Sequence, residues 1–520
     1  MASANDKALQ RRRFLQLAAT AGAGMFASAC ASKLGDRRDP LDPDAGAPDA
    51  EGSDAKAPPG SDASDASVDA SSKLTGPRRV GIASFVDRSQ RRAAVRRAVE
   101  LAGGVGFIKS GDRVLIKVAH NSPFAYPATV SPESCGELAR MCLDAGASRV
   151  TIADVMGIEN TLVPGGWALE GKFGRTLPWD PTTDATVRAF RASGLYAGIE
   201  EAVGAGRVGP TKEVRITSFR ELDWRRCETG GMAPRSGAGS RLVTRWLKEQ
   251  LATNVDADGK HEPRIYDPRV FDDLVSEDVA GFHVPNLLDE VDHIVNLHRV
   301  STHITSMFTT AVKNWVGIMR PDDRVWMHQL TFLRNQRAAL TDPLCTEPPY
   351  NEMLAELHLP TFARERLFFA DATDLFISGG PDESDSATYP AHLMLASTDI
   401  VAADVVNLAV LRLGALASVI EGGLGGKCSP VPQTALETTQ EFLAWRFHVR
   451  EHGLMRGTDL KLCDPKFSNW DWLAVRRARE LGIGADSPKD LGVAFAADGD
   501  FAVPPAHRDW IELDASRAPS

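Results

Sequence analysis

Short apolar runs alternate with helical patterns along much of the chain. Runs rich in branched and aromatic residues predict strands, and apolar residues at helical spacing predict amphipathic helices. The predicted strands cover residues 80–85, 114–118, 149–154, 279–284, 294–297, 367–371, 391–396 and 491–495. The predicted helices cover residues 89–101, 131–144, 186–203, 307–319, 324–339, 350–357, 399–413 and 470–481. Strands that alternate with helices indicate an α/β fold, with a mostly parallel sheet flanked by helices.

Residues 155–278 depart from this alternation. Glycine and proline are frequent there, and the helical pattern of residues 186–203 is the clearest element. We therefore expect an irregular insertion around residues 155–278. It interrupts an α/β body that spans residues 78–500, and a C-terminal tail follows at residues 501–520.

Residues 1–30 read as an export signal. Arg12-Arg13-Phe14-Leu15 stands before a mild apolar run, which is typical of twin-arginine signals that export folded proteins. The run of about ten residues is too short to span a bilayer. It ends in Ala27-Ser28-Ala29-Cys30, which resembles a lipoprotein cleavage box with Cys30 as the lipidated residue. Ordinary signal cleavage near the same place is the alternative.

Residues 31–77 are predicted to form a disordered acidic linker. They consist mostly of Asp, Ala, Pro, Ser and Gly, with too little apolar surface to offset the entropy of ordering. An anchor followed by such a linker predicts a membrane surface as partner, on the periplasmic or cell-envelope side. The net charge of −10 argues against nucleic acid, which needs clustered Lys and Arg.

The sequence identifies no cofactor. None of the seven cysteines forms a C-x-x-C pair, so there is no iron–sulfur or zinc-knuckle motif. Cys135 and Cys142 stand two turns apart on a predicted helix, roughly 10 Å, which is too far for a disulfide. The chain also has no Walker loop and no G-x-S-x-G elbow.

Histidine is concentrated in one stretch, since four of the 12 histidines fall within residues 292–328. His298 and His303 follow a predicted strand end, where α/β proteins commonly place their sites. Their spacing matches no metal signature such as H-E-x-x-H, so a metal would need a further ligand, such as His328. The metal is therefore unknown, and an ordinary hydrogen-bonding role is the alternative for each histidine.

Lys117 lies inside an apolar strand, and Asn121 comes just past the strand's end. Lys117 either binds an anionic or carbonyl group at the carboxyl edge of the sheet or pairs with a carboxylate such as Asp154. Lys313 and Asn314 are candidates for binding an anion or a cofactor, with an ordinary helix surface as the alternative.

Three aspartates complete the set of candidate residues. Asp371 stands at a predicted strand end. Asp399 opens a helix and is most simply its N-cap, whereas Asp404 lies among apolar residues of the same helix and is expected to point inward.

These segments together resemble the family known as domain of unknown function 362. The resemblance rests on G-D-R-V-L-I-K at 111–117, N-L-H-R-V-S-T-H at 296–303, T-T-A-V-K-N-W-V-G at 309–317, A-D-A-T-D at 370–374 and S-T-D-I-V-A-A-D at 397–404. It covers roughly residues 79–495. It implies the α/β fold and the location of a site. The chain lacks the clustered cysteines of many family members, so the resemblance implies no electron transfer.

The leading hypothesis is an exported, lipid-anchored α/β protein with a polar pocket that binds a small anionic ligand, cofactor or metal. The pocket residues are Lys117, Asn121, His303, Lys313, Asn314, Asp371 and Asp404. If the protein is an enzyme, His303 is the expected general acid or base and Lys313 stabilises developing negative charge. The alternative is a non-catalytic surface-binding lipoprotein.

Overall fold

The computed structural model describes residues 78–121, 124–155, 185–219, 240–243, 282–303, 307–319, 350–377, 388–420 and 467–519. All of them lie in the unit Gly76–Ser520, one of the two units into which the chain divides. The predicted signal and most of the predicted linker lie outside the described residues. Among the described helices, none is long and apolar enough to cross a membrane.

A mixed, mostly parallel sheet forms the centre of the fold, in the order β12-β1-β11-β10-β7-β2-β3-β4. Along this order only β11 runs antiparallel to its neighbours. The short strands β8 and β9 form a hairpin beside β10. The strands of this sheet are β1 Arg78–Ser84, β2 Arg113–Val118, β3 Arg149–Asp154, β4 Val214–Ser218, β7 His293–His298, β8 Ser301–His303, β9 Met307–Thr309, β10 Glu365–Phe376, β11 Thr388–Ser397 and β12 Leu491–Phe495.

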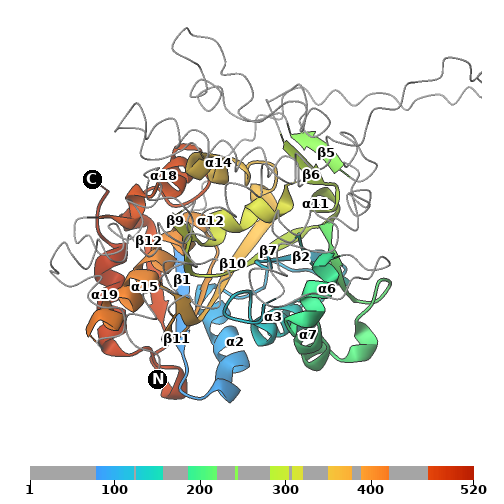
Figure 1. Ribbon diagram of the computed structural model, residues 1–520, viewed down its shortest axis with the longest axis horizontal. Helices are drawn as coiled ribbons and strands as arrows, with labels where there is room; N and C mark the ends of the chain where they lie inside the picture. The colour runs from blue at the N-terminus through green and yellow to red at the C-terminus, as the bar shows by residue number, and fades with distance from the viewer. Residues whose placement is uncertain are drawn as a thin grey trace, which may run out of the picture. The chain divides into compact units, whose positions relative to one another are not determined.

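Helices cover both faces of this sheet, as Figure 1 shows. One face packs against α2 Arg91–Ala102, α3 Pro132–Asp144, α6 Ala185–Ala192 and α7 Leu195–Val203. The other packs against α12 Ala311–Asn314, α14 Tyr350–Glu356, α15 Ile400–Ile420, α18 Leu473–Glu480 and α19 Pro505–Ala515. Because both faces are covered, the central strands are nearly continuous apolar runs, and in β2 only Arg113 is exposed.

The predicted α/β fold is confirmed, and several local predictions hold with it. Residues 149–154 and 491–495 form strands with the predicted bounds. Ser131 caps α3 by accepting the backbone N–H of Ser134, and Asp399 accepts the N–H of Ala402 at the start of α15. Cys135 and Cys142 are buried free thiols.

The predicted insertion at residues 155–278 needs a correction where the structure describes it. Residues 214–218 form β4, which extends the main sheet beside β3, and α7 packs against α3. The predicted helix of residues 186–203 is two helices, because Gly194 between them has a φ of 85°. Separately, β5 Ser240–Val243 pairs with β6 Phe282–Pro285, and α11 Leu287–Glu290 follows.

Two further predictions differ from the structure. Residues 307–319 are not one helix, because residues 307–309 pair with residues 301–303 before α12 begins. The C-terminal residues 501–520 are not a simple tail. Helix α19 packs through Ile511, and Asp514 pairs with Arg412 at 2.9 Å, so this helix belongs to the body.

Candidate functional site

The order of the strands reverses between β2 and β7, which lie side by side in the sheet. From β2 the chain crosses through α3 to β3, whereas from β7 it proceeds to β10 on the opposite side. Open α/β sheets bind ligands beyond the carboxyl ends of their strands at such a reversal. The register of the two strands sets Lys117 beside Asn296 at this edge.

Lys117 is buried at the reversal, with only 1% of its surface exposed. Its ammonium group donates to Asp154 Oδ1 at 2.8 Å, to Asn314 Oδ1 at 2.8 Å and to the backbone oxygen of Val118 at 2.7 Å. Three acceptors match its three donors, and a carboxylate compensates its charge. Of the two predicted alternatives, the structure therefore shows the pairing of Lys117 with Asp154. Lys117 joins β2, β3 and α12 through these contacts, and its expected ligand-binding role stays a prediction.

Asn314 closes the same network from α12. Its carboxamide donates to Asn296 Oδ1 at 2.7 Å, and Asn296 donates to the backbone oxygen of Ala311 at 3.0 Å. Asn314 thus links α12 to both β2 and β7. Its carboxamide is used in these contacts between elements, and its expected role as a ligand-binding residue stays a prediction.

Gly317 explains the spacing of the K-N-x-x-G segment. It lies in the 3-10 turn η5 Trp315–Ile318, directly after α12. A Cβ atom at this position would lie 2.6 Å from Lys117 Nζ and still closer to Asp154 Oδ1. Glycine is therefore required here by the close approach of the backbone to the buried ion pair.

Asp404 points inward as predicted, and its carboxylate accepts hydrogen bonds at the N-terminus of α12. It accepts hydrogen bonds from Thr310 Oγ1 at 2.7 Å, from the Ala311 N–H at 2.7 Å and from the Val312 N–H at 3.1 Å. Burial raises the pKa of Asp404 to about 6, against the opposing effect of these hydrogen bonds. Asp404 caps α12 from a distant helix, because the Thr310 side chain does not.

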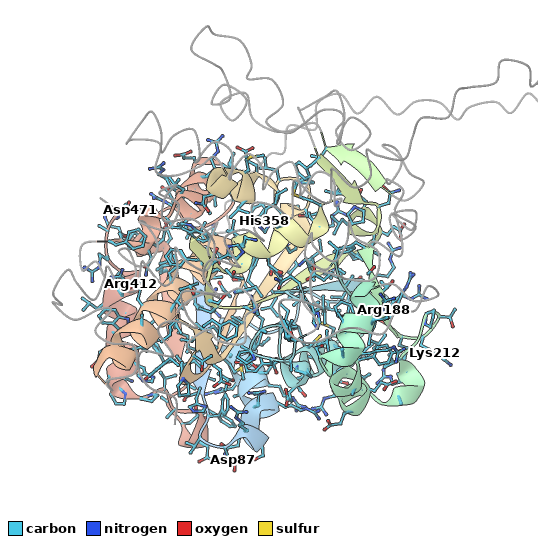
Figure 2. The ribbon with its side chains drawn as sticks, viewed as in Figure 1. Asp87, Arg188, Lys212, His358, Arg412 and Asp471 are labelled. Carbon is cyan, nitrogen blue, oxygen red and sulfur yellow. The ribbon has the colours of Figure 1, made fainter. Side chains whose placement is uncertain are left out.

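A second buried network supports α12, and the sequence did not point to it. His358 Nδ1 lies 2.8 Å from Glu365 Oε2, and His358 Nε2 lies 3.1 Å from the backbone oxygen of Val312. Thr361 donates to Glu365 and accepts from the indole N–H of Trp315. Both ring nitrogens of His358 thus lie within hydrogen-bonding distance of an oxygen atom. Figure 2 shows His358 in the interior beside α12.

Asp371 belongs to a different cluster, on the face covered by α2 and α3. It accepts hydrogen bonds from Tyr126 Oη at 3.0 Å, Ser134 Oγ at 2.7 Å and the Thr373 backbone N–H at 3.0 Å. Its Oδ2 atom lies 3.8 Å from Nε of Arg91. Asp371 is therefore separated from the Lys117 network by the sheet, and the predicted pocket residues do not form one cluster.

His303, Lys313 and Asn121 remain as candidate ligand-binding residues. His303 is buried in the β8–β9 hairpin, opposite Met307. Lys313 is half-buried on α12, next to Asn314, and Asn121 is half-buried just past β2. The expected roles of His303 as acid or base and of Lys313 in stabilising charge stay predictions.

Two other histidines at this edge are buried and neutral. Burial lowers the pKa of His298 to about 3, and its Nε2 lies 2.7 Å from Asn407 Nδ2. Burial likewise lowers the pKa of His120 to about 3, and its Nε2 lies 2.7 Å from Ser193 Oγ. The second pair has the spacing of a nucleophile and a base. A pKa this low makes His120 a weak base at neutral pH, so the pair is better explained as a packing contact.

Some candidates fall outside the described residues, including the lipidation candidate Cys30 and His328. Within the ranges that the structure describes, no group of three or more His, Cys, Asp or Glu side chains is placed to hold a metal ion.

Residues 245–409 match the family model described as domain of unknown function, DUF362. This segment of the chain is similar to the DUF362 family. No curated protein matches it. A crystal structure of a Thermotoga maritima protein, a structural genomics target, matches with a TM-score of 0.34 and 10% identity over 65% of this chain and 60% of that one. The chain thus spans less than two thirds of that structure.

The DUF362 match covers only one side of the network. It includes Asn314 and Gly317, which reach over the ion pair, and Asp404, which caps α12. Lys117 and Asp154, which form the ion pair itself, lie before the matched residues. The network at this edge therefore combines residues of the matched segment with residues of β2 and β3, which precede it in the chain.

Proposed function

We propose that this DUF362 protein is exported, lipid-anchored at Cys30, and binds a small anionic molecule at the carboxyl edge of its sheet, between β2 and β7. The twin-arginine pattern, the Ala-Ser-Ala-Cys30 box and the acidic linker support the location. The observation that carries the binding function is the reversal of strand order at this edge, with the half-buried Lys313 beside it.

Lys313 is the proposed contact for the anion. It sits on α12, whose start is held by Asp404 and whose last residue, Asn314, is tied to Lys117. The saturated network beneath α12 keeps this short helix in place, which favours a preformed position for the lysine. His303 is the proposed acid or base, should the bound molecule also react.

The experiment is a urea titration of the full chain with inorganic phosphate as the probe anion. Binding to the native state raises the free energy of unfolding, by about 1.4 kcal/mol at ten times the dissociation constant. Lys313→Gln is expected to abolish this increase. Lys109→Gln, an exposed lysine before β2 at the opposite edge of the sheet, is the matched control and should keep it. An increase unchanged in Lys313→Gln, or none in the wild type, contradicts the proposal.

The proposed location has a separate test. Cys30→Ser is expected to move the protein from the membrane fraction of its host to the soluble fraction, because it removes the lipidated residue. A variant that stays in the membrane fraction would exclude Cys30 as the anchor.

A further inference from the structure

Arg91 is a second buried cation, on the face of the sheet opposite the Lys117 network. It is the first residue of α2, and 5% of its surface is exposed. Its Nη1 atom donates to Glu133 Oε2 at 3.0 Å and to Ser131 Oγ at 3.4 Å. In the part of the chain that the structure describes, its Nε and Nη2 atoms have no hydrogen-bond partner, although both are shielded from solvent.

The two nitrogens without a partner belong to the same edge of the guanidinium group. The N–H of Nε and one N–H of Nη2 point in parallel, which is the arrangement that binds both oxygens of a carboxylate or phosphate. Buried donors are nearly always satisfied by protein, water or a ligand. We therefore expect a hydrogen-bond acceptor to bind these two parallel donors. This edge of Arg91 therefore has the chemistry of an oxyanion site.

Asp371 is the nearest buried carboxylate, but it does not occupy this edge. Its Oδ2 atom is 3.8 Å from Arg91 Nε, which is too far for a hydrogen bond. Tyr126, Ser134 and Thr373 donate to Asp371 at 3.0, 2.7 and 2.5 Å and hold it in place. The protein's own carboxylate is thus used by other donors.

The surroundings disfavour a doubly charged occupant more than a singly charged one. Helices α2 and α3 both begin here, and their N-terminal dipoles attract an anion. The Tyr126 ring centroid lies 5.0 Å from Arg91 Cζ. Asp371 and Glu133 already offset the charge of Arg91, so a dianion would meet stronger repulsion than a monoanion.

We propose that the Nε–Nη2 edge of Arg91 binds the carboxylate group of a small organic acid. This site is separate from the one proposed at Lys313, because α2 and α12 pack on opposite faces of the sheet. Arg91 precedes the DUF362 match in the chain, so this site is not confined to the matched segment.

The test is isothermal titration of the full chain with acetate and, separately, with inorganic phosphate. Acetate is expected to bind saturably and more tightly than phosphate. Arg91→Lys keeps the positive charge but lacks the parallel donors, and it should weaken acetate binding at least tenfold. Arg92→Gln is the matched control on the same helix. Arg92 pairs with Glu201 at 3.0 Å, and acetate binding should be unchanged in this variant.

Three results would overturn the proposal: no saturable acetate binding, which would leave an ordered water as the occupant; equal affinity in Arg91→Lys; or phosphate bound more tightly than acetate by Lys313→Gln, in which the other proposed anion site is removed. Arg91→Gln provides a second variant if Arg91→Lys does not fold. Lys313→Gln should leave acetate binding intact, so failure at one site does not decide the other.

Discussion

Lys117 and Arg91 are both buried cations at the carboxyl edge of one sheet, yet they differ in how fully their donors are used. Lys117 has three acceptors for its three N–H groups, and one of these acceptors is a carboxylate. Among the residues that the structure describes, Arg91 has acceptors only for Nη1. Burial and positive charge therefore do not identify a binding residue by themselves. The number of donors left without a partner separates a structural cation from a candidate ligand contact.

The difference arises from what packs against each cation. A distant segment, α12 with η5, covers Lys117 and brings an amide oxygen and a glycine that permits close approach. Arg91 is covered by Tyr126 and by residues whose acceptors are largely committed elsewhere, such as Asp371. Disturbing the saturated network should therefore cost stability, whereas disturbing the Arg91 edge should cost binding.

The largest effect is expected for Asp154→Ala. This variant leaves Lys117 buried without its carboxylate, which typically costs about 3–5 kcal/mol in the free energy of unfolding. Urea denaturation of the full chain measures it. Arg113→Gln is the control at the other end of β2, where the pair with Asp292 is about half exposed and contributes about 1 kcal/mol or less.

Urea denaturation of Arg91→Lys measures the stability contribution of the second buried cation. We expect a change of about 1 kcal/mol or less without ligand, because lysine can still pair with Glu133 and the lost N–H groups made no hydrogen bonds. A loss in Arg91→Lys as large as that in Asp154→Ala would remove the distinction drawn between the two sites.

A loss smaller than that of Asp154→Ala is expected for Gly317→Ala. The added methyl group would overlap the ion pair of Lys117 and Asp154, and overpacking of this kind costs about 1–3 kcal/mol. The midpoint of urea unfolding reports it. Gly106→Ala serves as the control, since no atom lies within 4 Å of its added methyl group. Equal stability of both variants would show that the segment after α12 does not rest on the ion pair.

An effect smaller than that of Gly317→Ala concerns Asp404 and depends on pH. Its folded pKa of about 6 lies above the ordinary value of 3.8, so the folded state binds the proton more tightly than the unfolded state. Asp404 therefore adds stability as the pH falls below about 6. Between about pH 7 and pH 5 the wild type should gain about 1 kcal/mol relative to Asp404→Asn. A difference that does not change with pH would contradict the raised pKa.

Much of the fold was predictable because it depends on residues close together in the chain. Branched apolar runs predicted the central strands, and Ser131 predicted the start of α3. The pairing of Lys117 with Asp154 was one of two stated alternatives, since both stand at the ends of adjacent parallel strands. The prediction of a helix at residues 307–309 was wrong. These residues form a strand because they pair with residues 301–303, and local sequence preference does not reveal that pairing.

The grouping of the candidate site residues could not be predicted from the sequence. Seven pocket residues were expected together, yet Asp371 lies on one face of the sheet and Asn314 on the other. Arg91 was missed because it appeared only as a charged position on a helix. His358 and Glu365 are seven residues apart and could have been noticed as a buried pair only from their contacts with Val312 and Trp315.

The sequence by itself determined the α/β class, most strands of the sheet and the segment in which Lys313, Asn314 and Gly317 lie. Only the tertiary structure decided which polar groups are satisfied. Lys117 meets Asn314 across 197 positions of the chain, and Tyr126 meets Asp371 across 245. Secondary structure follows from neighbouring residues, whereas hydrogen-bond saturation depends on distant segments that the fold brings together.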